Sequence, residues 1–277
     1  MIAKIIPATA IALLTLLAAI RATSSQIYSE PDKDRIKLSY AVYHAKCPPS
    51  QNIQEIYLCA LKTMSKKKEE NSESKKTLII LSSQGIADAS YSLFENRRSL
   101  DIKDKDAIQY LTKSAEAGYA AAQVELGILF LNGEMITQDS KEFYKLIKEA
   151  AEKGNYDGMK YLSKCYFSGT GVDRNDAIGF YWLNKLYTDY GPQFDDWDLL
   201  GNVYETGRGT TIDLVKAYMC YDLEGTAGIE EKARIAPQMT SEQRTEGLRL
   251  SREWQEKNHV YTMQSLGLSR QKDGSYR

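Results

Sequence analysis

The chain has 277 residues and a formal net charge of −1 at pH 7. Because it carries no overall excess of positive charge, a basic field that would attract nucleic acid or an anionic membrane is excluded. The composition, with 43% hydrophobic and 26% charged residues, agrees with a soluble helical protein. Nineteen tyrosines stand against six phenylalanines, and since tyrosine is enriched at protein interfaces, this surplus favours a protein-binding surface.

Residues 1–25 have the layout of a cleavable signal peptide. Lys4 precedes an apolar run from Ile5 to Ile20, and the small residues Ala22 to Ser24 follow it. A retained membrane anchor is the alternative, but this run of 16 residues is shorter than the roughly 20 that a spanning helix needs. We therefore expect an exported protein, periplasmic or secreted, with no stable membrane anchor after cleavage.

Residues 26–76 are expected to form an N-terminal helical region followed by a charged linker. Two short helices are predicted at Ile36–His44 and Ile53–Met64, in a piece separate from the rest of the chain. Lys66–Lys76 is highly charged, but acidic residues interrupt it and it contains no aromatic residue. It therefore indicates a solvated helix end and linker rather than a nucleic-acid-binding patch.

Cys47 and Cys59 flank the turn at Pro48-Pro49 and lie twelve residues apart. In an exported chain this pair predicts a disulfide, to which the loop-entropy model assigns about 3 kcal/mol. Two free buried thiols are the alternative.

A period of 36 or 37 residues organises the middle of the chain. Glycines close successive units at this spacing, and a second series of glycines recurs 36 and 38 residues apart. A fixed period in this range is typical of a helical solenoid rather than a single globular core. The first series is Gly118, Gly154, Gly191 and Gly228, and the second is Gly133, Gly169 and Gly207.

Within one unit the spacing predicts two helices, A and B. Ala122, Leu126 and Phe130 recur every four residues, so they share one stripe of helix A. The glycine turn follows, and the Ala150-Ala151 pair near the end of helix B leaves room for the next helix A to approach. An aspartate stands where each helix B begins, where its carboxylate can accept hydrogen bonds from first-turn N–H groups. These aspartates are Asp139, Asp176 and Asp213.

The order Ala-x-x-x-Leu-Gly-x-x-Tyr-x-x-Gly-x-Gly, then Asp-x-x-Lys-Ala, then Lys-Ala-Ala-x-x-Gly, resembles the Sel-one-like repeat family, a relative of the tetratricopeptide arrays. The resemblance covers about residues 85–254. It implies an all-α fold, a right-handed α-solenoid of helix-turn-helix repeats with an N-terminal helical piece and a C-terminal capping helix. The array then spans residues 77–228, as a degenerate repeat at 77–118 and full repeats at 119–154, 155–191 and 192–228.

One junction departs from the family pattern. Gly158 replaces an alanine and Ser163 a glycine in the second copy, and Leu186-Tyr187-Thr188 replaces its small pair. Asp196 replaces an alanine in the third copy. We expect this junction to be bulkier than the one at Ala150-Ala151.

Residues 229–257 are expected to close the array with a capping helix. Ile229–Met239 is expected to be irregular around Pro237, and either Thr240 or Ser241 to cap a helix running to about Lys257. Residues 258–277 are expected to be a flexible tail. The side chains expected to cover the end of the stack are Leu248, Leu250 and Trp254.

No constellation in the sequence predicts catalysis, a metal site or a cofactor. The two histidines are His44 and His259, and nothing in their spacing brings them to a cysteine or carboxylate cluster. Cys165 and Cys220 occupy apolar or aromatic positions of the repeat, which indicates packing.

Two other patterns have structural explanations. Gly169-Thr170-Gly171 and Gly207-Arg208-Gly209 lack the Gly-Lys-Ser/Thr ending of a phosphate-binding loop, so they are expected to be repeat turns. A carboxylate pair for acid–base chemistry is the alternative use of an acidic cluster at the start of the third helix A, but helix N-termini favour acidic residues in any case. This cluster is Asp195, Asp196 and Asp198.

The variable positions of helix A are the candidate partner-binding residues. They lie between the packing residues and are expected to face the inner wall of the solenoid. Their mixed character suits a protein or peptide partner, although simple solvation is the alternative. They are Glu125, Ile128, Asn132, Tyr161, Lys164, Ser168, Asp198, Leu199, Asn202 and Thr206.

The resemblance implies an exported scaffold that binds another protein and is not an enzyme. Exported bacterial members of this family include immunity proteins against periplasm-acting toxins, notably phospholipase effectors delivered by type VI secretion, and immunity is our most specific expectation. An envelope adaptor in signalling or host interaction is the alternative. A β-lactam or peptidoglycan hydrolase is a third, but the family members described as hydrolases carry a cysteine pair in each repeat, which this chain lacks.

Overall fold

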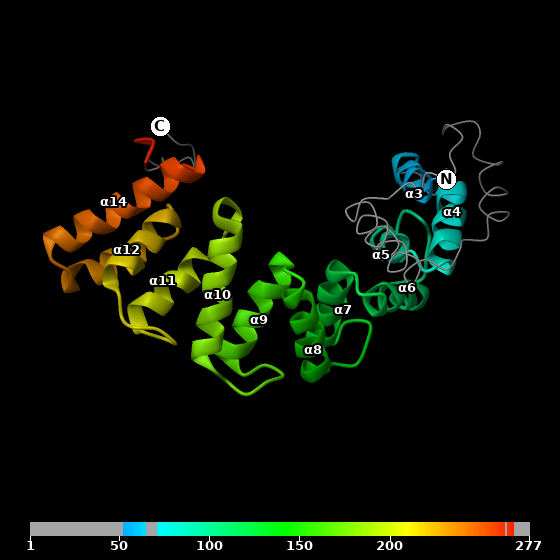
Figure 1. The fold of residues 1–277 in the computed structure, drawn as a ribbon, viewed down its shortest axis with the longest axis horizontal. Coiled ribbons are helices and arrows are strands. Elements are labelled where there is room, and N and C mark those ends of the chain that lie inside the picture. The colour runs from blue at the N-terminus through cyan, green and yellow to red at the C-terminus, as the bar shows by residue number, and fades with distance from the viewer. Residues whose placement is uncertain (1–51, 65–70, 264, 269–277) are drawn as a thin grey trace, which may run out of the picture. The chain divides into compact units, whose positions relative to one another are not determined.

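The computed structural model describes residues 52–64, 71–263 and 265–268 (Figure 1). The chain divides into two compact units, Met1–Thr137 and Gln138–Arg277. Every regular element in the described ranges is helical, which confirms the predicted all-α class, and none of these helices is long and apolar enough to cross a membrane. The predicted signal peptide, the predicted helix Ile36–His44 and Cys47 lie outside the described residues.

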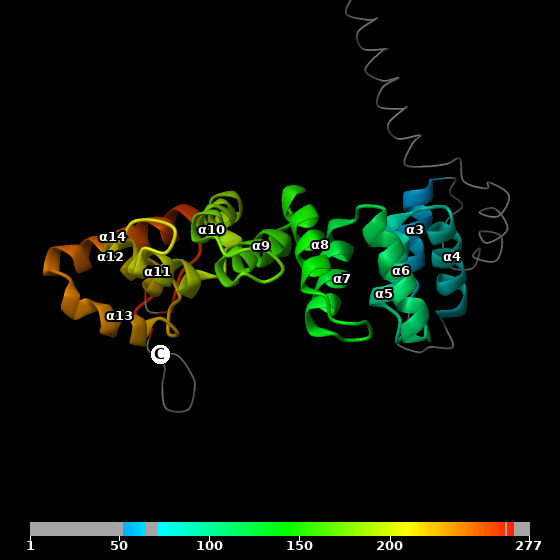
Figure 2. The ribbon, with the colours of Figure 1, turned by 90° about the horizontal axis from the view of Figure 1, so that it is seen from below.

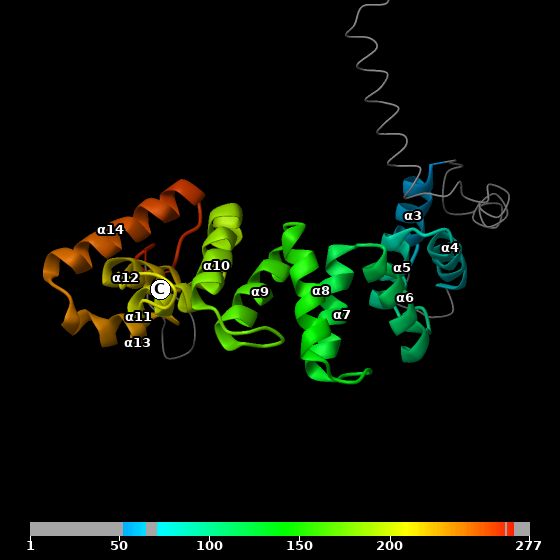
Figure 3. The same ribbon diagram turned by 60° about the horizontal axis from the view of Figure 1, so that its bottom comes forward.

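The described part of the first unit consists of helices that each pack against the next along the chain. Figure 3 shows the earliest of them, α3 to α6, gathered at its blue and cyan end. The helices are α3 (Ile53–Lys62), α4 (Ser72–Ser83), α5 (Ala87–Glu95), α6 (Asp104–Glu116) and α7 (Ala120–Asn132).

Helix α3 shares one hydrophobic core with α4 and α5. Ile56 and Ala60 of α3 are buried in a cluster with Leu78 and Leu81 of α4 and Leu93 of α5. The N-terminal region was predicted to be separate, and for α3 this is wrong. A single short helix cannot bury its own apolar stripe, so α3 uses the first helices of the array to do so.

Helix α4 begins inside the stretch predicted to be a charged linker. Asn71 and Ser74 are buried, and Nδ2 of Asn71 donates a 3.0 Å hydrogen bond to the carbonyl oxygen of Ser99. From Ser72 onward the linker prediction is therefore wrong. The charged side chains hid the start of the helix because its first buried residues, Ser74 and Thr77, are small and polar, and the buried leucines follow only at Leu78 and Leu81.

In the second unit, α9 packs against both α8 and α10, and α12 packs against α11, α13 and α14. Figure 2 shows α12, α13 and α14 together at one end of this unit. Its helices are α8 (Ser140–Glu152), α9 (Tyr156–Ser168), α10 (Asp176–Tyr190), α11 (Trp197–Thr206), α12 (Leu214–Leu223), α13 (Ile229–Ile235) and α14 (Ser241–Asn258), with 3-10 turns η2 (Gly191–Gln193) and η3 (Ala236–Gln238).

Glycine ends helix A in each of the three full repeats. Gly133, Gly169 and Gly207 follow α7, α9 and α11 with φ angles of 72°, 78° and 70°. These left-handed conformations place a side chain too close to the backbone, so glycine adopts them at the lowest cost. The predicted positive-φ turns are confirmed.

Aspartate caps two of the three B helices. The Asp139 carboxylate accepts hydrogen bonds from the N–H groups of Lys141 and Glu142, at 2.9 and 3.1 Å, at the start of α8. The Asp213 carboxylate accepts one from the N–H of Lys216 at 3.0 Å, at the start of α12. These three hydrogen bonds satisfy first-turn donors as predicted.

At α10 the predicted aspartate cap is wrong. Asn175 is the capping residue, and its side-chain oxygen accepts a hydrogen bond from the N–H of Ile178 at 3.1 Å. Asp176 is the first helical residue instead. Its carboxylate accepts hydrogen bonds from the guanidinium groups of Arg174, at 2.7 Å, and of Arg208, at 3.0 Å.

The Ala150-Ala151 pair allows α9 to lie very close to α8. Both alanines are buried. A Cβ atom on Gly158 of α9 would lie 2.7 Å from the Ala151 nitrogen and 3.0 Å from the Ala150 Cβ. Glycine in place of the usual alanine therefore makes this contact closer rather than bulkier.

Aromatic rings fill the junction between α10 and α11. Tyr187 packs edge-to-face on both Phe194 and Trp197, with ring centroids 5.6 Å apart in each case. Trp197 in turn lies 4.8 Å from Trp254 of α14. The larger residues that replace the small pair are thus accommodated by an aromatic cluster, in line with the expected bulkier junction.

Thr240 is the hydroxyl residue that caps α14. Its Oγ1 accepts a hydrogen bond from the Gln243 N–H at 3.2 Å, and Gln243 Oε1 accepts one from the Thr240 N–H at 2.9 Å. This reciprocal capping box fixes the start of the helix. The preceding segment, expected to be irregular, forms α13 and η3.

Helix α14 packs with the predicted Trp254, which lies against Trp197, and with small and polar residues that were not predicted. Gly247, Ser251 and Gln255 are buried, whereas Leu248, Leu250 and Trp254 remain partly exposed. The reason is a polar partner on α12, since Ser251 Oγ donates a 2.7 Å hydrogen bond to the Asp222 carboxylate. A stripe of small and polar residues brings α14 close enough to make this bond.

Described residues after α14 form hydrogen bonds with its last turn, and the flexible tail at 258–277 stays a prediction. The Thr262 N–H donates a 2.8 Å hydrogen bond to Gln255 Oε1.

Glu205 of α11 joins helices α12 and α13. Tyr221 Oη donates a 2.7 Å hydrogen bond to Glu205 Oε2, and Arg234 Nη2 donates one to the same oxygen at 2.8 Å. The Arg234 hydrogen bonds outweigh burial and hold the pKa of Glu205 below its usual value of 4.5.

Glu205→Gln is expected to lower the free energy of unfolding at pH 7 by about 2 kcal/mol, because it weakens charge-assisted hydrogen bonds. A carboxylate with a depressed folded pKa contributes stability above the unfolded value of 4.5, and this contribution is lost as pH falls through the folded pKa. The variant should therefore lose less stability than the parent chain on acidification, as measured by urea unfolding from about pH 7 down to about pH 3. Glu246→Gln, which alters an exposed pair with Arg249, is the control and should have a much smaller effect. Equal losses and equal acid slopes for the two variants would contradict the assignment.

Candidate functional site

The predicted partner-binding residues of the second unit lie on α9 and α11. Tyr161, Lys164 and Ser168 are spaced three and four residues apart, and so share a face of α9. Asp198, Asn202 and Thr206 do the same on α11. Four of these six side chains are exposed, whereas Tyr161 and Asn202 are half-buried.

Ion pairs link this face of α9 to the start of α11. Lys164 Nζ lies 3.0 Å from an Asp196 carboxylate oxygen, and Lys160 Nζ lies 2.8 Å from Asp195. Burial raises the pKa of Asp195, but hydrogen bonds from Lys160 and from Tyr156 Oη outweigh it, so the pKa lies below its usual value. Part of the predicted acidic cluster therefore neutralises lysines of the neighbouring helix.

Other predicted residues of this unit are also engaged within the protein. The Tyr161 ring packs edge-to-face on Phe143 of α8, with centroids 6.0 Å apart. Ser168 and Thr206 donate 2.8 Å hydrogen bonds back to the carbonyl oxygens of Lys164 and Asn202. Asp198 is exposed. The face thus offers hydroxyl and amide groups, one carboxylate, and an already paired lysine.

The predicted residues of the first unit lie on α7. Glu125 and Ile128 are half-buried, and Asn132 is exposed, with its Nδ2 3.5 Å from a Glu134 carboxylate oxygen. Glu125 belongs to a wider group that the sequence did not single out.

Three tyrosines and three carboxylates gather in the first unit, and we name this group the tyrosine–acid surface. The rings of Tyr91 and Tyr119 lie 5.1 Å apart, and Tyr57 Oη lies 2.8 Å from Ser92 Oγ. Burial raises the pKa of Tyr91, and the charges of Glu95 and Glu125 raise it further. Burial also raises the pKa of Tyr119, with help from Asp88 and Glu95. The surface consists of Tyr57, Asp88, Tyr91, Glu95, Tyr119 and Glu125.

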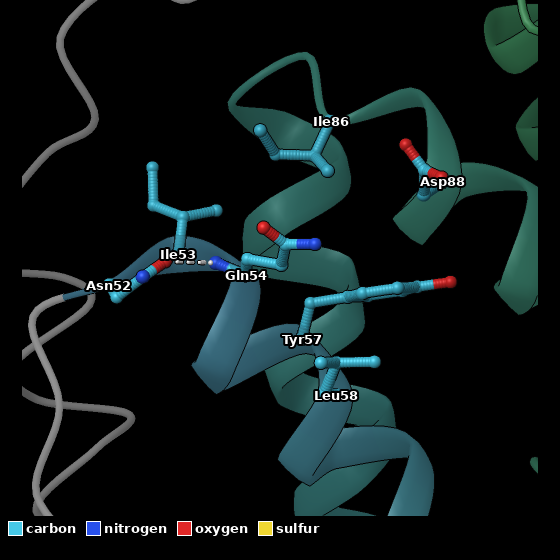
Figure 4. Close-up of a pocket in the computed structure, with 7 residues that line it drawn as sticks. All are labelled: Asn52, Ile53, Gln54, Tyr57, Leu58, Ile86 and Asp88. Atoms are coloured by element: carbon cyan, nitrogen blue, oxygen red, sulfur yellow. Dashed lines mark hydrogen bonds between the residues drawn. The ribbon is translucent and has the colours of Figure 1, made fainter.

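A cleft of about 490 Å³ adjoins the tyrosine–acid surface (Figure 4). Figure 4 shows the Tyr57 ring projecting from α3 toward the start of α5, where Asp88 lies. Leu58 is 44% exposed although it is apolar. The cleft is lined by Asn52, Ile53, Gln54, Tyr57, Leu58, Ile86 and Asp88.

Sequence reasoning missed this cleft because α3 and α5 lie outside the three regular repeats. The tyrosine surplus was the one signal that pointed toward such a surface, but a count of tyrosines does not show where in the fold they lie. The closeness of Tyr57 and Asp88 depends on α3 packing against the array, which no local pattern revealed.

Cys165 and Cys220 are buried within helices, and His259 follows the end of one, in the described part of the chain. Burial raises the pKa of Cys165 to about 12 and also raises that of Cys220, so both thiols stay protonated. His259 is an exposed residue that ends α14 with φ 55°. In the part of the chain that the structure describes, no group of three or more His, Cys, Asp or Glu residues is placed to hold a metal ion.

Cys59 is disulfide-bonded, whereas Cys165 and Cys220 are free. Because Cys47 lies outside the described residues, its pairing with Cys59 stays a prediction.

The Sel1 repeat family model matches four segments of the chain, residues 101–119, 120–155, 157–188 and 199–223. Among solved structures, a protective antigen present in uropathogenic Escherichia coli strains, which displays an SLR fold, is 22% identical with a TM-score of 0.62. That match covers 75% of this chain and 46% of the antigen, and it shows a likeness of fold. A Sel1 repeat protein from Oxalobacter formigenes is 24% identical over 41% of this chain and 87% of its own, with a TM-score of 0.40.

Among curated proteins, the rat (Rattus norvegicus) DAP3-binding cell death enhancer 1 is 26% identical over 98 residues. These residues are 35% of this chain, and the match spans only 18% of the length of the rat protein.

Proposed function

We propose that the protein is an exported scaffold that binds another protein and catalyses no reaction, because four of its segments match the Sel1 repeat family model. Export rests on the predicted signal peptide, and binding rests on how the repeats use their residues. Leu126, Leu162 and Leu200, at equivalent positions of helix A, are 5%, 1% and 0% exposed. Their variable neighbours Lys164 and Thr206 are exposed, although Lys164 also pairs with Asp196.

This division between constant packing and variable surface is the observation that carries the proposal. A repeat scaffold keeps its frame through the buried positions and can vary the others to suit a partner. The face of α9 and α11 offers hydroxyl, amide and charged groups, which suit the polar parts of a protein interface.

As to the partner, we propose a toxin that acts in the periplasm, such as a phospholipase effector delivered by type VI secretion, which this protein would neutralise. The support is the combination of a predicted signal peptide with the repeat type, which resembles that of exported immunity proteins. The rat relative is itself named for binding another protein. An envelope adaptor in signalling or host interaction uses the same surface and differs only in its partner.

Site-specific photocrosslinking in living cells tests the binding role. A photoreactive residue at Asn202 or Thr206 of α11 is expected to capture a discrete protein, which mass spectrometry then identifies. The same residue at Tyr181 of α10, which is 58% exposed, is the control and should capture little. Equal capture at all three positions, or none at any, would contradict binding through this face.

The immunity role needs its own test. Cells that direct the captured effector to their periplasm should grow when the whole chain is co-produced, and should stop growing when a version without residues 1–25 is co-produced. Growth that does not depend on the chain would refute immunity and leave the adaptor role. Turnover of a β-lactam or peptidoglycan by the purified protein, abolished by one substitution, would instead establish a hydrolase.

A further inference from the structure

We propose that the cleft between α3 and the start of α5, together with the tyrosine–acid surface, docks a basic segment of the partner in which an arginine lies next to an apolar residue. This inference rests on the proposed binding function and names the chemistry of one contact. It concerns the first unit alone.

The cleft supplies the apolar half of this contact. Ile53, Leu58 and Ile86 line it, and Leu58 leaves 44% of its surface exposed. An exposed leucine in a concave site gains free energy when an apolar side chain covers it, at about 25 cal/mol per Å² buried. The volume of about 490 Å³ is large enough for one or two side chains.

Carboxylate groups supply the charged half of the proposed contact. Asp88 lies at the cleft, Glu95 follows two turns later on α5, and Glu125 lies on α7. None of these carboxylates forms an ion pair with another described residue of the chain. The charges of Asp88 and Glu95 nevertheless reach Tyr57 and contribute to raising its pKa, after burial. Negative charge of this kind attracts a cation and repels nucleic acid.

The tyrosines favour arginine over lysine as the cation. A guanidinium group can pair with a carboxylate and at the same time stack on an aromatic ring, and tyrosine rings accept such stacking. Tyr91 and Tyr119 present two neighbouring rings, with centroids 5.1 Å apart, close to Glu95 and Glu125. Charge complementarity therefore selects a basic protein segment over an acidic one.

Fluorescence anisotropy on the whole chain tests the proposal with a labelled peptide of alternating arginine and leucine. We expect saturable binding that weakens at high salt, and at least tenfold weaker binding by the Asp88→Asn/Glu95→Gln variant. Leu58→Gln should also weaken binding, because it makes the cleft wall polar. The matched control is Asp173→Asn/Glu256→Gln, which removes two exposed carboxylates of the second unit and should leave binding unchanged. Circular dichroism must show that each variant keeps its helices.

Three results obtained without the captured partner would overturn the inference. One is equal binding of a peptide in which glutamate replaces arginine, and another is equal weakening by the control variant. The third is a photoreactive residue at Leu58 that crosslinks to residues 1–51 of the same chain or to a second copy, since the cleft would then have an internal occupant. If the captured partner binds the Asp88→Asn/Glu95→Gln variant with unchanged affinity, this inference fails and the proposed function stands. If the arginine peptide binds as expected but α11 captures no partner, the proposed function fails and the preference of the cleft for a basic segment stands.

Discussion

Gly209→Ala is expected to lower the free energy of unfolding of the second unit by about 2–5 kcal/mol, the sum of backbone strain and overpacking. Gly209 has φ +74°, and a Cβ atom there would lie 2.0 Å from the carbonyl oxygen of Asp176. That oxygen belongs to the first turn of α10. At the second glycine of the Gly-x-Gly turn, the backbone of one repeat therefore lies close to the backbone of the preceding repeat. Between the two glycines, Arg208 lies over the Phe167 ring, 4.6 Å from its centroid, and donates to Asp176. Urea unfolding followed by circular dichroism measures the loss.

Two further glycines make this prediction specific. Gly171, in the preceding repeat, would place a Cβ atom 2.0 Å from the Ser140 carbonyl oxygen, so Gly171→Ala should cost a similar amount. Gly154 has φ +79° but no atom within 4 Å of such a Cβ, so Gly154→Ala should cost only about 1 kcal/mol, from strain alone. If Gly209→Ala and Gly154→Ala have equal effects, close stacking of the turn on the preceding repeat is not what the second glycine provides.

Asp222→Ala is expected to lower the free energy of unfolding by about 3–5 kcal/mol and to loosen α14 from α12. The Asp222 side chain is 13% exposed, and it accepts hydrogen bonds from Lys232 at 2.6 Å and from Ser251 at 2.7 Å. Ser251 in turn accepts a 3.0 Å hydrogen bond from Gln255. These hydrogen bonds form a polar row that depends on the Asp222 carboxylate as acceptor. Its removal leaves buried donors without a partner, which destabilises the fold more than the loss of an exposed ion pair does.

The control for this variant is Asp189→Ala on α10. Asp189 pairs with Lys185 at 2.6 Å, but its side chain is 40% exposed, so the loss should stay below about 1 kcal/mol. Hydrogen exchange should show faster exchange in α14 for Asp222→Ala only. Equal exchange in both variants would mean that α14 is held by its ring contacts rather than by this polar row.

The period of the repeats was predictable from the sequence because it rests on local requirements. A glycine such as Gly169 adopts the left-handed conformation after a helix, and an aspartate such as Asp139 accepts hydrogen bonds from first-turn N–H groups. Both requirements are local, so the spacing of these residues alone marks the helix ends. The all-α class followed directly from that spacing.

The incorrect predictions concern two choices: which of two neighbouring residues caps a helix, and which side chains of a helix are buried. Asn175 and Asp176 are both good caps, and the choice of Asn175 depends on arginines that Asp176 meets from the adjacent turn. On α14 the leucines suggested the inner face, but Ser251 had a partner in Asp222 that only the packed structure brings near. In both cases a polar partner far away in the sequence, Arg208 for Asp176 and Asp222 for Ser251, influenced the outcome.

The cleft and the tyrosine–acid surface were not predictable at all. They depend on α3 packing beside α5, which places Tyr57 next to Ser92. These residues are 35 positions apart and share no repeat pattern.

The most direct test of the central claim, that helix A faces bind a partner protein, is hydrogen exchange of the whole chain with and without the captured partner. The account predicts slower exchange on binding in α5, α7, α9 and α11, with little change in α6, α8, α10 and α12. Protection confined to the B helices, or no change in any helix at saturating partner, would contradict it.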